Sequence, residues 1–111
     1  MKMIVATIRT SQFQNIKQLL LQTSTTSLTV YPVNSYKKNT SIPYISTDNE
    51  TAMVNKMRIE IAVDDNHVDS LLNVIRSTGA DNCEHNDDTI AVYDLVQCIR
   101  IRTGESGTTA L

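Results

Sequence analysis

Two arginines near the C-terminal end of the chain have the residue type and spacing of an anion-binding pair. They are Arg100 and Arg102, in the run Ile99–Arg102, which predicts a short extended segment. Side chains two residues apart on an extended segment leave the same face, and a guanidinium group offers a planar fork of donors that suits phosphate oxygens. The pattern also fits an exposed, solvated strand face, so the pair alone leaves both interpretations open.

The glycines exclude the common phosphate-binding folds. The chain has three of them, Gly79, Gly104 and Gly107. The cradles G-x-x-x-x-G-K-[ST] and G-x-G-x-x-G need glycine where the backbone approaches a phosphate, and neither pattern occurs in the sequence. A P-loop NTPase and a Rossmann enzyme are therefore excluded. Neither His67 nor His85 has a catalytic partner at a defined spacing, so we expect no enzymatic activity.

An acidic loop over residues 79–88 contains two weak candidate metal ligands, Cys83 and His85. The loop has four acidic residues and no lysine or arginine. Thiolate, imidazole and carboxylate groups can all bind transition metals, but a single C-x-H lacks the spacing of a zinc site. The loop is therefore either a metal-responsive site or a plain solvated loop.

Length and charge narrow the class of protein. The chain has 111 residues, 41% of them hydrophobic, and a formal charge of −2, which predicts one domain over residues 1–111. The slight negative charge argues against nucleic acid as a partner. No apolar run approaches the roughly 18 residues of a membrane helix, and the N-terminal residues read as a strand rather than a signal peptide. We expect a cytoplasmic protein without membrane insertion.

The periodicity of apolar residues predicts the order β-α-β-loop-β-α-β. A ferredoxin-like α+β sandwich has this order, with two helices covering one face of a four-stranded sheet. The first helix is expected to start at the capping box Ser11–Gln14, and Asp64–Asn66 is expected to cap the second. The long stretch 34–55 has little apolar periodicity, which is typical of a functional loop. Alternation predicts strands over residues 2–9, 28–33, 56–63 and 89–93, and an open sheet face that carries Thr7, Arg9, Thr29, Tyr31, Arg58 and Glu60.

The run Ile99–Glu105 resembles the C-loop of the P-II nitrogen-regulatory signalling proteins, whose pattern is A/V-I-R-I-R-T-G-E. Leu28–Val30 is similar to the family's M-T-V strand, and Lys56–Ile61 to its K-[VI]-K-[LI]-E-[IV]. The resemblance covers essentially the whole chain except two loops. It implies a homotrimer with adenine nucleotides in the clefts between subunits. It also implies that a long T-loop, here residues 34–55, docks on ammonium channels or nitrogen-metabolism enzymes.

The resemblance carries roles to individual residues. In many family members 2-oxoglutarate binds beside ATP and Mg²⁺ at the base of the T-loop, and here Asn39 and Lys56 match the residues that hold it. The partner-binding part of the T-loop would include Tyr36, Lys37 and Tyr44. The implied nucleotide or anion ligands lie in the second strand, the T-loop base, the third strand, the B-loop (residues 79–88) and the C-loop and tail (residues 99–111): Thr29, Lys38, Glu60, Gly79, Arg100 and Arg102.

Two loops depart from the family pattern. The T-loop base G-F-G-R-Q is replaced by Ser35–Asn39, which contains no glycine. The B-loop pattern T-G-x-x-G-D-G-K is reduced to Thr78-Gly79, and its last lysine is replaced by Thr89 or lost. Four carboxylates near a triphosphate repel it, and salt weakens that repulsion without reversing it.

These departures predict altered or lost sensing of ATP and 2-oxoglutarate. We expect binding of ADP, AMP or another anion, or of ATP with reduced affinity, and no uridylylation at Tyr44, whose surroundings do not match the family's modification site. The regulated partner would be a transporter or a metabolic enzyme. The alternative hypothesis is a metal-responsive trimeric module that uses the loop containing Cys83 and His85.

Overall fold

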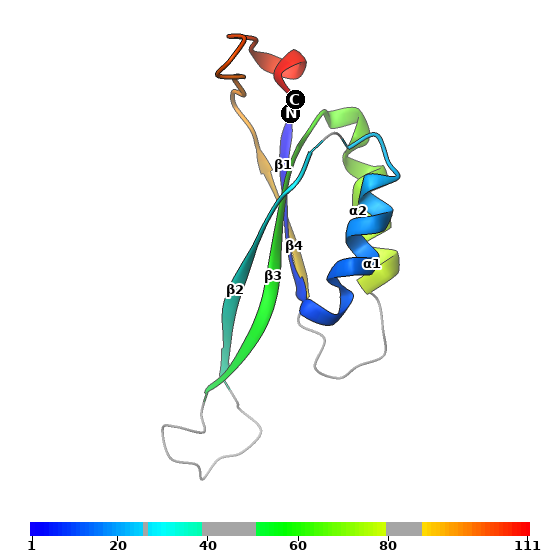
Figure 1. Cartoon of the computed structure of the whole chain (residues 1–111), viewed down its shortest axis with the longest axis vertical. Coiled ribbons are helices and arrows are strands. Elements are labelled where there is room, and N and C mark those ends of the chain that lie inside the picture. The colour runs from blue at the N-terminus through cyan, green and yellow to red at the C-terminus, as the bar shows by residue number, and fades with distance from the viewer. Residues whose placement is uncertain (26, 39–50, 80–87) are drawn as a thin grey trace.

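The computed structural model describes residues 1–25, 27–38, 51–79 and 88–111. Its order of helices and strands confirms the predicted β-α-β-β-α-β arrangement (Figure 1). Two short 3₁₀ turns, η2 and η3, precede the second helix and close the chain. The bounds are β1 (Lys2–Arg9), α1 (Thr10–Leu21), β2 (Thr29–Lys38), β3 (Thr51–Val63), η2 (Asp65–His67), α2 (Val68–Gly79), β4 (Thr89–Asp94) and η3 (Gly107–Ala110).

The four strands form one sheet in the order β2-β3-β1-β4, and every neighbouring pair is antiparallel. Both helices lie on the same face of this sheet (Figure 1). The helix-crossover connections put β1 in the interior of the sheet, and β2 and β4 form its edges. The chain therefore has the ferredoxin-like α+β sandwich that the sequence predicts.

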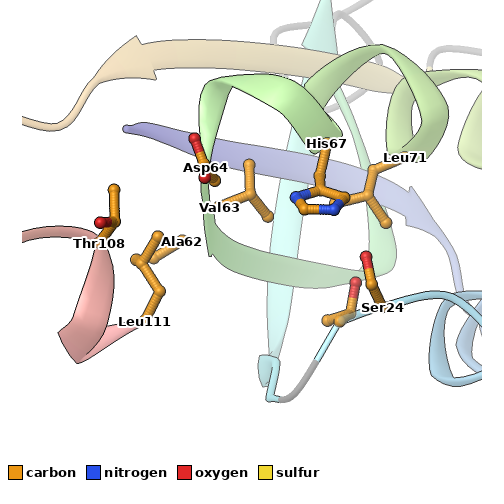
Figure 2. A pocket seen from close by; sticks show the side chains of 9 residues that line it. Ser24, Ala62, Val63, Asp64, His67, Leu71, Thr108 and Leu111 are labelled. Atoms are coloured by element: carbon orange, nitrogen blue, oxygen red, sulfur yellow. The ribbon is translucent and has the colours of Figure 1, made fainter.

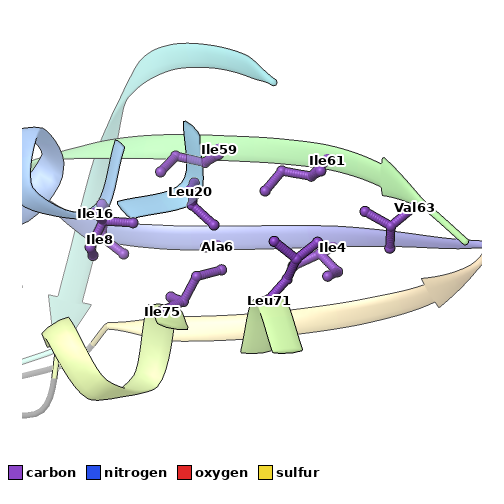
Figure 3. Close-up of a cluster of buried hydrophobic side chains, with 10 residues drawn as sticks. All are labelled: Ile4, Ala6, Ile8, Ile16, Leu20, Ile59, Ile61, Val63, Leu71 and Ile75. Atoms are coloured by element: carbon purple, nitrogen blue, oxygen red, sulfur yellow. The ribbon is translucent and has the colours of Figure 1, made fainter. Parts of the chain in front are cut away.

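The core lies between the sheet and the two helices (Figure 3). Ile4, Ala6 and Ile8 alternate along β1, so their side chains point to the helix-covered face. Ile16 and Leu20 of α1 are four residues apart and pack on this face, because positions i and i+4 share one side of a helix. The remaining members come from β3 and α2: Ile59, Ile61, Val63, Leu71 and Ile75.

The opposite face carries the polar residues that the alternation predicts. Arg58 is paired with Thr7 on one side and with Tyr31 on the other. Residues that are paired across an antiparallel ladder share a face, so all three side chains leave the sheet together. The two helices lie on the other side of the sheet, and this open face is free of them (Figure 1).

The second and third strands extend well into the segment that the sequence reads as a loop. Five additional pairs, from Asn34↔Asn55 to Lys38↔Thr51, continue the β2–β3 ladder beyond the end of β1. We call residues 34–38 and 51–55 the ribbon; it projects away from the helices (Figure 1). The prediction was wrong here because ladder hydrogen bonds join backbone groups, and an exposed two-stranded ribbon needs no apolar alternation.

The predicted helix starts were also wrong in detail. Helix α1 begins at Thr10 with Arg9 as its N-cap, and no side chain of Arg9 caps the helix. Because β1 runs directly into α1 with no connecting residue, Ser11 already lies within the first turn and cannot cap it. Asp64 is the N-cap of η2 without a side-chain cap bond, and α2 follows η2 directly.

Candidate functional site

The C-loop forms a tight hairpin, not the extended segment that its alternation predicts. Ile99 pairs with Ser106 in an antiparallel bridge. Inside it, the N–H of Arg100 donates to the carbonyl of Glu105 at 2.8 Å, and the N–H of Gly104 donates to the carbonyl of Arg100 at 2.8 Å. Gly104 has a φ of 75°, a backbone conformation that glycine adopts without steric cost. The backbone conformation of this turn therefore explains why the motif has a glycine at position 104.

The turn separates the two arginines that were expected to leave one face together. Nη2 of Arg100 donates to the carbonyl oxygens of Ala110 at 3.4 Å and Leu111 at 3.2 Å. Arg102 lies in the turn and is exposed. The same-face prediction was wrong because it assumed a strand, whereas residues 101–103 form the hairpin turn. Arg100 fastens the tail to the hairpin, and the guanidinium of Arg102 faces solvent.

Thr29 and Glu60 are brought together by the sheet register. They are direct partners in the β2–β3 ladder. The hydroxyl of Tyr31 donates to Oε1 of Glu60 at 2.6 Å, and this hydrogen bond, together with burial, raises the pKa of Tyr31 above 10.0. Thr29 lies in the edge strand β2, and the C-loop follows the opposite edge strand β4. The predicted nucleotide ligands therefore divide into two groups within one chain.

Lys56 is buried, with a relative exposure of 6%, rather than solvated at a strand end. Its Nζ lies 3.7 Å from Oδ1 of Asp88, whose side chain is 10% exposed. The same carboxylate accepts the backbone N–H of Arg9 at 3.1 Å and Nε of Arg9 at 3.3 Å. Three chain segments thus meet at one carboxylate: the end of β1, the middle of β3 and the residue before β4.

Sequence reasoning missed both partners of Lys56 in this cluster. Arg9 was assigned only to the open sheet face, and Asp88 only to the acidic loop. A signal existed in the predicted alignment of strands, because a register that pairs Thr7 with Arg58 also pairs Arg9 with Lys56. Two cations at adjacent positions of one face require an anion between them or solvent around them, and solvent is largely excluded here.

Several predicted site residues lie outside the described residues or have only their backbone described. Asn39, Tyr44, Cys83 and His85 belong to the first group. Lys37 and Lys38 are the last residues of β2, and Gly79 is the last residue of α2. Tyr36 is exposed on the ribbon opposite Met53, which is also exposed. In the part of the chain that the structure describes, no three His, Cys, Asp or Glu side chains gather as metal ligands.

A pocket of about 200 Å³ lies beside the end of β3 and was not predicted (Figure 2). It brings together the connection after α1, the end of β3, η2, α2 and the C-terminal tail. Its lining mixes apolar side chains with hydroxyls, one imidazole and one carboxylate: Ser24, Thr25, Ala62, Val63, Asp64, His67, Leu71, Thr108 and Leu111.

In the described segments, neither helix has the length and apolarity to cross a membrane.

Comparison with known proteins identifies the family. The model of the family described as nitrogen regulatory protein P-II matches residues 1–105. The chain belongs to the P-II family. The nitrogen regulatory protein P-II of Nostoc punctiforme is 32% identical over 113 residues, and the match covers all of both chains. The P-II 1 protein of Escherichia coli K12 is 31% identical, again over the full length of both.

The fold agrees with solved P-II structures. The chain resembles GlnK of B. subtilis with a TM-score of 0.84 and 26% identity, covering 99% of this chain and 97% of that one. The GlnK–ATP complex of B. subtilis gives a TM-score of 0.83 at the same identity, covering 99% and 94%. The protein is thus a P-II-type signal-transduction protein, and this family is regulatory rather than enzymatic.

Proposed function

We propose that the chain is a trimeric P-II-type regulator that controls a partner transporter or metabolic enzyme through its T-loop, with altered sensing of ATP and 2-oxoglutarate. The nucleotide site would lie between subunits and take ADP, AMP or ATP with reduced affinity. A cytoplasmic location is part of this proposal. The observation that carries it is the combination of a projecting ribbon and an intact C-loop hairpin on a P-II scaffold.

The ribbon supports the partner-binding part. It extends the β2–β3 ladder by five pairs beyond β1, so the T-loop starts from a paired platform held away from the helices (Figure 1). Tyr36 and Met53 are direct partners on it, and both are exposed. Exposed aromatic and methionine side chains are enriched at protein interfaces. A partner protein would bury this pair.

Exposed apolar side chains around the C-loop support the trimer. Val96 is 94% exposed and Ile101 is 98% exposed. Because a buried Val or Ile side chain contributes about 1.5–3 kcal/mol, their exposure in a single chain favours an interface with another copy. A second copy would also bring the two groups of nucleotide ligands together. The C-loop of one subunit would face the Thr29–Glu60 pair of its neighbour across the subunit boundary.

The charges of the residues at the end of the B-loop support the proposal of an altered nucleotide site. The GlnK of B. subtilis has been solved in complex with ATP, so this scaffold accommodates the nucleotide. In this chain the last lysine of the B-loop pattern is replaced by Thr89 or lost, and Asp88 directly precedes Thr89. A triphosphate would lose one cation and meet an additional carboxylate at this end of the site, which favours nucleotides with fewer phosphates.

Isothermal titration with AMP, ADP and ATP, each with and without Mg²⁺, tests the nucleotide part. We expect ADP or AMP to bind at least as tightly as ATP. Arg102→Ala should weaken binding at least about tenfold, because a charge-assisted phosphate contact contributes about 1.5–3 kcal/mol. Arg76→Ala is the matched control, since Arg76 is exposed on α2. Failure of all three nucleotides to bind would remove the nucleotide part of the proposal.

The partner part is tested with purified candidate partners, an ammonium channel and nitrogen-metabolism enzymes of the same organism. The purified protein should bind one of them, and Tyr36→Ala should weaken binding. Asn73→Ala, at an exposed position on α2, should leave it unchanged. Equal loss from both variants would contradict a role for the ribbon.

A further inference from the structure

Among the described residues, Lys56 is the most enclosed cation, and the carboxylate of Asp88 lies against it. Its Oδ1 accepts the backbone N–H of Arg9 at 3.1 Å and lies 3.7 Å from Nζ of Lys56, and its Oδ2 lies 3.3 Å from Nε of Arg9. Arg9 is the N-cap of α1, whose first turn contains no acidic residue. The carboxylate therefore lies at the positive end of a helix dipole as well as between two cationic side chains.

We propose that Asp88 is a built-in counter-ion that occupies the anion position formed by Arg9 and Lys56 and excludes small external dicarboxylates from it. The inference rests on the proposed function, because Lys56 is the residue that the P-II resemblance links to 2-oxoglutarate. It adds the residue that decides specificity: the anion site is present, and the chain's own carboxylate fills it.

Charge balance supports this assignment. Lys56 is 6% exposed, and an ammonium group this enclosed is costly without an anion in contact. Asp88 places a negative charge against both Arg9 and Lys56. A dicarboxylate that entered beside Asp88 would meet this carboxylate at close range, where like charges repel strongly.

Tethering strengthens the exclusion. Asp88 directly precedes Thr89, the first residue of β4, and Thr89 is paired with Thr7 of β1. The carboxylate is therefore held at the site by the sheet. An intramolecular group of this kind competes at an effective concentration of millimolar or above, so a metabolite of similar intrinsic affinity at lower concentration is a weak competitor.

Titration with 2-oxoglutarate tests the proposal on the full chain. The variants are wild type, Asp88→Asn and Asp94→Asn, each first checked by thermal melting. Asparagine keeps the shape and can still accept the Arg9 N–H, but it lacks the charge. Asp94→Asn is the matched control, because Asp94 forms an exposed ion pair with Lys2 at the other end of β4. We expect Asp88→Asn to bind at least about tenfold more tightly than the other two.

A second change assigns the new binding to the cluster. Lys56→Met in the Asp88→Asn background should return the affinity to the wild-type level. Asp88→Ser replaces Asp88→Asn if the latter does not fold. The proposal is overturned if wild type binds 2-oxoglutarate as tightly as the Asp88 variant, or if that variant binds no better than Asp94→Asn. Trimer mass and ADP binding are measured on the same samples, so failure of the proposed function is recognised separately.

Discussion

The hydroxyl of Tyr31 donates a hydrogen bond to Oε1 of Glu60 at 2.6 Å, diagonally across the β2–β3 ladder. Tyr31 itself is paired with Arg58, and Glu60 with Thr29. The bond therefore fixes the carboxylate beside Thr29 on the open face, and the P-II resemblance implies that both residues are nucleotide ligands. A tyrosine that holds a predicted site residue in position also reports on it, because its own ionisation depends on that carboxylate.

The first prediction concerns the pH at which Tyr31 ionises. Its pKa is raised above 10.0, chiefly by the hydrogen bond to Glu60. A raised pKa in the folded state means that the bond contributes stability below pH 10, which is lost as the pH rises through the folded pKa. In an absorbance titration, the difference between wild type and Tyr31→Phe should show a phenol that ionises above pH 10. In Glu60→Gln its midpoint should fall; an unchanged midpoint would contradict the assignment.

The second prediction compares two aspartates near the two ends of β4. Asp88→Ala should destabilise the fold by about 3 kcal/mol, because it leaves the enclosed Lys56 ammonium without its carboxylate. Asp94→Ala removes an ion pair with Lys2 in which the carboxylate is 83% exposed. Solvent screens such a pair, so we expect no resolvable change in the urea midpoint. Equal midpoints for both variants would show that the Asp88 cluster is not enclosed in solution.

The third prediction tests the packing of α2 on the sheet. Leu71 is fully buried in the core. Leu71→Ala should lower the free energy of unfolding by about 3 kcal/mol, because it removes buried methyl groups and leaves a cavity. Leu21→Ala, at an exposed position at the end of α1, is the control and should change stability little. Urea unfolding of the two variants at equal protein concentration measures the difference.

The fourth prediction concerns the C-loop hairpin. A Cβ added at Gly104 would meet no atom within 4 Å, but its φ of 75° is unfavourable for an L-residue. Gly104→Ala should therefore cost about 1 kcal/mol through the backbone alone. Gly104→Asn should cost less, because asparagine tolerates this conformation better. If alanine and asparagine are equally tolerated, the hairpin does not keep this turn in solution.

The fifth prediction tests the trimer. Wild type should elute with a mass close to three times 12.4 kDa in size exclusion with light scattering. Ile101→Asp should reduce that mass, because it places a charge on a side chain that is 98% exposed in the single chain and expected at the interface. Thr103→Asp, an exposed neighbour in the same turn, controls for added charge. A monomeric wild type would contradict the assembly.

The fold was predictable because two periodicities describe most of it. Alternation located β1 and β4 to within a residue at each end, and the i, i+3, i+4 spacing located α2. The ribbon escaped prediction because its pairing rests on backbone hydrogen bonds, and exposed side chains such as Tyr36 and Met53 give no hydrophobic pattern to follow. The start of α1 escaped because its cap position falls on Arg9, a residue with no capping propensity.

The candidate site was predictable where a motif fixed the residues and unpredictable where the chain brings distant residues together. Arg100, Arg102, Thr29 and Glu60 came from runs that match the P-II pattern, but the turn that separates the two arginines followed only from the backbone. The contact of Asp88 with Lys56 joins the start of one edge strand to an interior strand. No local spacing encodes such a contact, because it depends on strand order and register.

The pairing of β3 changes at Lys56, where the four-stranded sheet meets the two-stranded ribbon. Lys56 is the first residue of β3 that is paired with β1, and residues 51–55, which precede it, are paired in the ribbon with β2 alone. Five residues at about 3.3 Å each make a lever of roughly 17 Å. A rotation of about 10° at its base would move the far end by roughly 3 Å, so a small change in the sheet near Lys56 is enlarged along the ribbon.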